Sequence, residues 1–126
     1  MAMSPHPSAF SPVVLIVEDE ALLRMLAVDF LEDEGFVVLE AATAEEAVSI
    51  LESRPDIGVL FTDVNMPGTM DGLGLATHVA ERWPHIRLVV TSGRQGLTSD
   101  QLPDDGQFVQ KPYGQRQLVS AIAHAA

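Results

Sequence analysis

Residues 57–67 read IGVLFTDVNMP, an apolar run that ends abruptly in polar residues. The run from Ile57 to Phe61 is too short to be a helix of its own, so it predicts a buried strand. Asp63 comes just after this strand, and Met66-Pro67-Gly68 predicts a turn directly beyond it. The stretch therefore places a carboxylate at the carboxyl end of a buried strand.

Apolar runs of the same kind occur on both sides of this strand, separated by helical patterns. Uniformly apolar strands that alternate with helices predict an α/β fold of three layers, α/β/α, around a five-stranded parallel sheet. The other strands are predicted at Val13–Val17, Phe36–Leu39, Ile86–Val90 and Gln107–Gln110. Four helices are predicted between and after these strands. The first ends before Gly35 and has Leu23, Ala27, Phe30 and Leu31 on its inner face, and the second follows the capping box formed by Thr43 and Glu46. The third runs from about Asp71 to Pro84, and the last covers Tyr113–His124.

Two segments lack this periodicity. Met1–Pro12 carries three prolines among Ser and Ala, which predicts a flexible leader before a single domain over residues 13–126. Gly93–Gly106 is interrupted by Pro103, and its Leu97 and Leu102 form no continuous stripe. We expect a fourth helix there that is short or irregular, and the least ordered part of the folded domain.

Composition excludes several classes of function. A chain of 126 residues fits one domain, and a net charge of −11 with only seven Lys and Arg residues disfavours direct binding of nucleic acid. No cysteine is present, so disulfides and thiolate chemistry are excluded. No apolar stretch approaches the roughly 18 residues that span a bilayer, which predicts no membrane insertion and a cytoplasmic location.

The predicted strand ends bring polar residues to one edge of the sheet. Parallel sheets bind ligands beyond the carboxyl ends of their strands, where Glu18, Asp19 and Asp63 would converge. Three neighbouring carboxylates resist joint ionisation unless a cation relieves their repulsion. Oxygen ligands without His or Cys suit Mg²⁺.

Two further side chains at this edge could handle a phosphoryl group. Lys111 is the only lysine of the chain, and it could pair with Asp63 and then with a phosphoryl oxygen. The Ser92 hydroxyl could donate a hydrogen bond to another oxygen of that group. A carboxylate nucleophile, a metal, a cation and a hydroxyl are the parts that form and hold an aspartyl phosphate.

At these residues the chain resembles the response-regulator receiver domains of two-component signalling, over residues 13–124. The fold that this resemblance implies is doubly wound and flavodoxin-like, with strand order 2-1-3-4-5. The matching motifs, in order, are Leu15-Ile16-Val17-Glu18-Asp19-Glu20, Asp63-Val64-Asn65-Met66-Pro67, Asp71-Gly72, Thr91-Ser92-Gly93 and Phe108-Val109-Gln110-Lys111-Pro112-Tyr113.

The resemblance implies a role for each matching residue of the acidic edge. Asp63 would be the phosphoacceptor, and Asp19 a direct Mg²⁺ ligand. Glu18 would hold metal-bound water, and the backbone carbonyl of Asn65 would complete the ligands. Lys111 matches the lysine of the family.

Three more positions match the family's conformational switch and its last loop. Ser92, rather than Thr91, would be the switch hydroxyl, because Gly93 supplies the small residue that follows it. Phe108 falls at the aromatic switch position, although a plain core role stays open. Pro112 is a candidate for a cis peptide bond.

Some residues depart from the family pattern. The turn from Gly68 to Gly72 has one extra residue, and the segment between Ser92 and Lys111 is short. These departures leave open which surface carries the output signal.

The resemblance predicts a phosphoacceptor switch that takes its phosphoryl group from a histidine kinase or a histidine phosphotransfer protein. The domain would catalyse only its own phosphorylation and dephosphorylation. Since the sequence ends at Ala126, we expect output through a partner protein, as a monomer or a phosphorylation-dependent dimer.

Alternatives from other classes remain. One is a constitutive binding module that is never phosphorylated, and another is a domain of a hybrid histidine kinase. A haloacid-dehalogenase-type phosphotransferase is disfavoured, because Asn65 stands where its second Asp would be.

Overall fold

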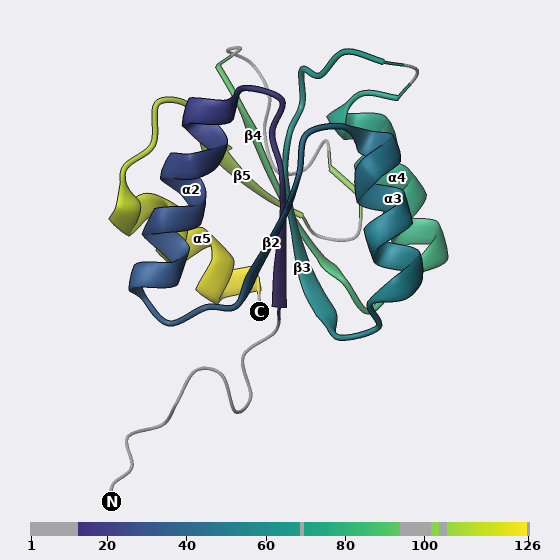
Figure 1. The fold of residues 1–126 in the computed structure, drawn as a ribbon, viewed down its shortest axis with the longest axis horizontal. Helices are drawn as coiled ribbons and strands as arrows, with labels where there is room; N and C mark the ends of the chain where they lie inside the picture. Colours follow the sequence, from purple (N-terminus) through teal and green to yellow (C-terminus); the bar gives the residue numbers. More distant parts are fainter. Residues whose placement is uncertain (1–12, 69, 94–101, 104–105, 126) are drawn as a thin grey trace, which may run out of the picture.

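A computed structural model describes residues 13–68, 70–93, 102–103 and 106–125 of the chain. Five parallel strands form one sheet in the order β2-β1-β3-β4-β5 (Figure 1), which confirms the predicted fold class and strand order. The strands are β1 (Val13–Val17), β2 (Val38–Ala41), β3 (Ile57–Asp63), β4 (Arg87–Ser92) and β5 (Gln107–Gln110). The described helices are α2 (Ala21–Asp33), α3 (Ala44–Ser53), α4 (Gly72–Arg82) and α5 (Gln115–Ala125).

Helices cover both faces of the sheet, with α2 and α5 on one face and α3 and α4 on the other (Figure 1). Successive residues of a strand point to opposite faces, so β1 contributes Val14 and Ile16 to one core and Leu15 and Val17 to the other. All four side chains are buried, which explains why this strand is apolar throughout. The two cores together hold the sheet in a fixed position between its helices.

Side-chain caps start two of the helices. Thr43 Oγ1 accepts a hydrogen bond of 3.1 Å from the Glu46 amide, as the predicted capping box requires. The Glu46 carboxylate reaches the amide of Ala42, at 2.6 Å, which lies one residue before the predicted partner. Asp71 Oδ1 caps α4 by accepting from the Gly74 amide at 2.8 Å.

The boundaries of three strands differ from those predicted. Strand β2 begins at Val38 rather than Phe36, because Gly35 (φ 93°) and the amide of Phe36, which donates to Leu31 O at 3.1 Å, still belong to the end of α2. Strands β3 and β4 continue to Asp63 and Ser92, two residues further than predicted. Both polar residues are therefore held by the sheet itself rather than by loops.

The remaining predictions concern the first twelve residues, the segment before β5 and the absence of a membrane-spanning helix. The predicted leader Met1–Pro12 and most of Gly93–Gly106 lie outside the described residues. Leu102 is described there and packs against the core under α3 and α4. The Gly106 amide donates to Pro103 O at 3.1 Å in a turn before β5. In the described part of the chain no helix is both long and apolar enough to cross a membrane.

Candidate functional site

The sheet register brings the predicted site residues to one edge. Asp63 lies opposite Thr91 of β4, and Ser92 lies opposite Gln110 of β5. The Lys111 amide extends this ladder by donating to Ser92 O at 3.0 Å. The carboxyl ends of β3, β4 and β5 therefore form one continuous rim, and Glu18 joins it from the end of β1.

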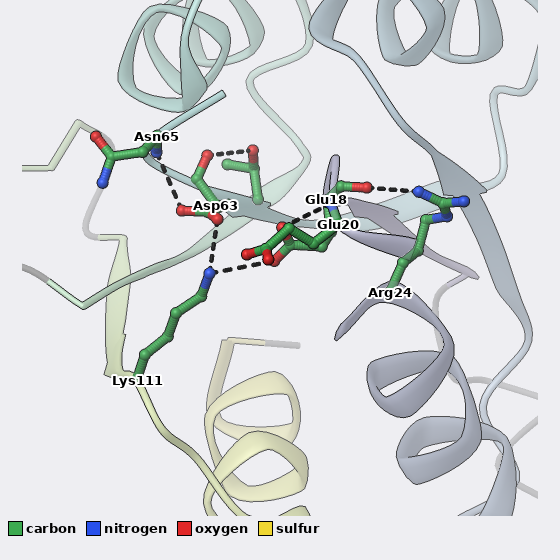
Figure 2. Close-up of polar contacts among 7 residues, drawn as sticks. Glu18, Glu20, Arg24, Asp63, Asn65 and Lys111 are labelled. Atoms are coloured by element: carbon green, nitrogen blue, oxygen red, sulfur yellow. Dashed lines mark hydrogen bonds and ion pairs between the residues drawn. The ribbon is translucent and has the colours of Figure 1, made fainter. Parts of the chain in front are cut away.

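Lys111 is the centre of this rim. Its Nζ lies 2.7 Å from Asp63 Oδ2 and 3.3 Å from Glu18 Oε1 (Figure 2). Only 20% of the Lys111 side chain is exposed, with 6% for Asp63 and 4% for Glu18. The ammonium is therefore shared between two carboxylates that are nearly removed from water. The contact with Asp63 agrees with the sequence-based expectation, whereas the contact with Glu18 was not foreseen.

Asp63 is held from the other side by the backbone that follows it. Its Oδ1 accepts from the Asn65 amide at 3.0 Å (Figure 2), and its backbone oxygen accepts from Thr62 Oγ1 at 3.0 Å. The carboxylate thus has one oxygen on a backbone amide and the other on an ammonium.

Helix α4 starts in direct contact with this part of β3. A Cβ atom added to Gly72 would lie 1.8 Å from the backbone oxygen of Asp63, so no other residue fits without a backbone shift. The Gly72 amide donates to Val64 O at 2.9 Å. Gly72 therefore sets how closely α4 approaches the backbone that carries Asp63.

Glu18 is also fixed by several groups. Its Oε2 accepts from the Glu20 amide at 3.3 Å, and its own amide donates to Ala41 O at 3.1 Å. Its backbone oxygen accepts from Arg24 Nη1 at 2.8 Å, and Arg24 Nε donates to Glu40 Oε1 at 3.0 Å. Arg24 was not singled out in the sequence, because an arginine in the first turns of an amphipathic helix is usually a solvated surface residue.

Burial controls the charge of the rim. Burial, followed by the negative charge of Asp63, raises the pKa of Glu18 to about 7, although Lys111 and the Glu20 amide oppose this shift. For Lys111, burial disfavours the ammonium, but the hydrogen bond with Asp63 and the charges of Asp63 and Glu18 outweigh this and raise its pKa. Burial, followed by the charge of Glu18, raises the pKa of Tyr113 to about 12. The rim therefore keeps its one cation while one of its carboxylates resists ionisation.

The same rim fits a hard divalent cation. Glu18, Asp19 and Asp63 each offer a carboxylate oxygen, and these atoms lie within 4.8 Å of one another. An oxygen-only donor set suits Mg²⁺, and a cation there would relieve the repulsion that raises the pKa of Glu18. Asn65, whose backbone carbonyl is the fourth expected ligand, follows Asp63 by two residues at this edge.

The remaining expected site residues lie around the rim. Ser92 is fully buried at the end of β4. Phe108 lies opposite Val90 in the register and packs, half-buried, against the core under α3 and α4. The Lys111–Pro112 peptide bond is cis. The Thr91 hydroxyl is buried and has no hydrogen-bond partner among the described residues.

The fold and this carboxylate–lysine cluster define a doubly wound α/β domain with an acidic site at the carboxyl edge of its sheet, where three carboxylates could hold a metal ion. The chain belongs to the response regulator receiver domain family, whose sequence profile matches residues 14–123. It is therefore a receiver domain of two-component systems.

Curated relatives agree with this family. The chain is 34% identical over 116 residues to the sensor kinase CckA of Brucella abortus, covering 89% of this chain and 12% of that protein. It is 35% identical over 113 residues to the transcriptional regulatory protein PdtaR of Mycobacterium tuberculosis, covering 86% of this chain and 54% of that protein. The chain thus spans only part of these relatives.

Solved structures give the same picture. A response regulator receiver protein from Sinorhizobium medicae matches with a TM-score of 0.82 and 27% identity, over 93% of this chain and 95% of that one. The receiver domain of NtrX from Brucella abortus matches with a TM-score of 0.80 and 28% identity, over 89% and 96%.

Proposed function

We propose that Asp63 accepts a phosphoryl group in a Mg²⁺-dependent reaction, and that the phosphorylated domain signals by a conformational change to a protein partner. The observation that carries this proposal is the buried Asp63 carboxylate, held 2.7 Å from the Lys111 ammonium beside Glu18 and Asp19. A structural ion pair would not need two more carboxylates at the same place, because each raises the cost of ionising the others.

The residues of the chain account for the transfer step. An oxygen of Asp63 forms a bond to phosphorus while the phosphorus–nitrogen bond of a phosphohistidine donor breaks, and the imidazole leaves with the electron pair. Glu18, Asp19, Asp63 and the Asn65 carbonyl would hold Mg²⁺, and the bound ion would offset negative charge on the nucleophile and on the phosphoryl oxygens.

Lys111 and Ser92 act after the bond has formed. The Lys111 ammonium, which stays charged because its pKa is raised, moves from Asp63 Oδ2 to a phosphoryl oxygen. The Ser92 hydroxyl donates to a second oxygen, and Phe108 turns inward as that strand end moves. The domain catalyses only its own phosphorylation and dephosphorylation.

A protein donor is supported by the surface next to the rim. Helix α2 begins two residues after Asp19 and exposes Leu22 (80%), Met25 (57%) and Leu26 (42%). Exposed apolar residues that cluster on one helix suit contact with another protein. The proposed donor is a histidine kinase or a histidine phosphotransfer protein of the cytoplasm.

Labelling with a small phosphodonor tests the central claim. Acetyl phosphate should add one phosphoryl group, seen by intact-protein mass spectrometry, with Mg²⁺ but not with a chelator. Asp63→Asn should remove the label, whereas Asp56→Asn, which changes an exposed aspartate paired with Arg54, should keep it. A label that survives in Asp63→Asn would refute the proposal, and an unlabelled wild type would favour a constitutive binding module.

A further inference from the structure

Arg24 joins three elements behind the acidic rim. From α2, its Nη1 donates to the backbone oxygen of Glu18 at 2.8 Å (Figure 2). Its Nε donates to Glu40 Oε1 of β2 at 3.0 Å. Its side chain is 21% exposed, compared with 52% for the Arg82 side chain of α4. The guanidinium is thus held in one orientation by two acceptors, one just after β1 and the other in β2.

The Glu18 oxygen that Arg24 holds belongs to the peptide unit that leads into Asp19. Since a peptide unit is planar from one Cα to the next, fixing this carbonyl also fixes the direction of the Asp19 amide and the position of the Asp19 Cα, from which the side chain starts. Asp19 is exposed, and within the described part of the chain its carboxylate has no hydrogen bond or ion pair of its own. Its placement near Glu18 and Asp63 therefore depends on the backbone, for which Arg24 is the side-chain donor.

We propose that Arg24 is a positioning residue for the metal site, holding the Glu18–Asp19 peptide so that the Asp19 carboxylate faces Asp63. The inference rests on the proposed function, because it assumes that Mg²⁺ binds at Glu18, Asp19 and Asp63. Glu40 completes the arrangement: its carboxylate orients the guanidinium and offsets its charge, so a cation beside it is less strongly repelled.

Charge and geometry predict opposite effects for this residue. If Arg24 acted only through its charge, its removal would strengthen cation binding, because a nearby positive charge opposes Mg²⁺. If it acts by holding the peptide, its removal weakens binding. Arg24→Lys keeps the charge but cannot supply the two-pronged donor geometry, so it separates the two effects.

Titration calorimetry of Mg²⁺ into the unphosphorylated protein is the test. We expect both Arg24→Met and Arg24→Lys to bind Mg²⁺ about tenfold more weakly, the usual loss when a group that orients a metal ligand is removed. Arg82→Met is the matched control, because it breaks the 2.9 Å contact of Arg82 with Glu52 far from the rim, and it should bind like the wild type.

A second measurement separates positioning from general damage. The Mg²⁺ concentration that half-saturates acetyl phosphate labelling should rise about tenfold in both Arg24 variants, while the rate at saturating Mg²⁺ stays close to that of the wild type. Wild-type affinity in both variants, or tighter binding by Arg24→Met, would overturn the inference and leave the proposed function intact. A wild type that does not bind Mg²⁺ would overturn both.

Discussion

Charged side chains are buried at the carboxyl end of the sheet and exposed at the opposite end. At the carboxyl end, the side chains of Lys111, Asp63 and Glu18 are at most 20% exposed and contact one another. At the opposite end, two ion pairs have side chains that are 40–52% exposed. Arg54 pairs with Asp56 in the loop before β3, and Arg82 pairs with Glu52 between the last turns of α4 and α3. Exposed pairs contribute little to stability, whereas burying charge is costly even when it is paired. The buried cluster is therefore best explained by the proposed binding of a cation and a phosphoryl group, and the exposed pairs by solubility.

The largest expected effect concerns the buried cation. Lys111→Ala should slow labelling by acetyl phosphate roughly a hundredfold, because a charge aimed at the developing phosphoryl oxygens is lost. The backbone amide shifts that accompany phosphorylation should also largely disappear. Time-resolved mass spectrometry measures the first effect, and two-dimensional NMR measures the second.

An exposed cation provides the control for this result. Arg116→Ala removes the same charge from the exposed face of α5 and should leave both readouts unchanged. A wild-type response in Lys111→Ala would show that its position among the carboxylates does not matter.

The next effect tests the close backbone contact at the carboxyl end. Gly72→Ala should lower the free energy of unfolding by about 3 kcal/mol, because the new methyl would overlap the backbone of Asp63 and α4 must shift. Gly74→Ala, in the same helical turn, meets only the Met70 and Asp71 side chains and should be neutral or slightly stabilising. Urea unfolding compares the two. Equal effects would show that the contact with Asp63 is not tight.

The pKa of Glu18 predicts a smaller, pH-dependent effect. Its value of about 7 in the folded protein exceeds the ordinary 4.5, so folding favours the protonated form. The contribution of Glu18 to the free energy of unfolding is largest below pH 4.5, falls as the pH rises from 4.5 to 7, and is constant above pH 7. The loss should be on the order of 3 kcal/mol in the metal-free protein.

Unfolding of Glu18→Gln across this pH range isolates the contribution. The difference in unfolding free energy between wild type and Glu18→Gln should change between pH 4.5 and 7, and saturating Mg²⁺ should reduce the change. A difference that stays constant across this range would mean that Glu18 ionises normally.

The smallest effect is expected at the opposite end of the sheet. Glu52→Gln breaks the exposed pair with Arg82 and should change the unfolding free energy by less than about 0.5 kcal/mol. Mg²⁺ binding and labelling should not change. A loss as large as that of Gly72→Ala would remove the contrast between the two ends.

The sequence predicts the fold well because its information is local. Short apolar runs such as Ile57–Phe61 mark the strands, and the rule that parallel strands present ligands at their carboxyl ends predicts that Asp63 and Lys111 meet. The boundary of β2 was wrong by two residues, since Phe36 is as apolar as a strand residue but closes a helix.

The contacts behind the site could not be predicted in the same way. Arg24 contacts the backbone oxygen of Glu18, just after β1, and the carboxylate of Glu40 in β2, and residue type alone does not reveal such partners. Gly72 looks like an ordinary turn glycine in sequence, and only the packing of α4 on β3 shows why a side chain is excluded. Both contacts depend on three-dimensional distances between elements.

The site at the rim can form only late in the synthesis of the chain. Glu18, Asp63 and Lys111 are separated by 45 and 48 residues along the chain, so they meet only after β5 has paired with β4. A nascent chain that has left the ribosome only as far as β3 carries Asp63, the proposed phosphoacceptor, without Lys111. Distant pairings of this kind are the slow steps of folding. Under the proposed function, phosphorylation therefore requires a complete sheet, and chains whose synthesis is unfinished do not signal.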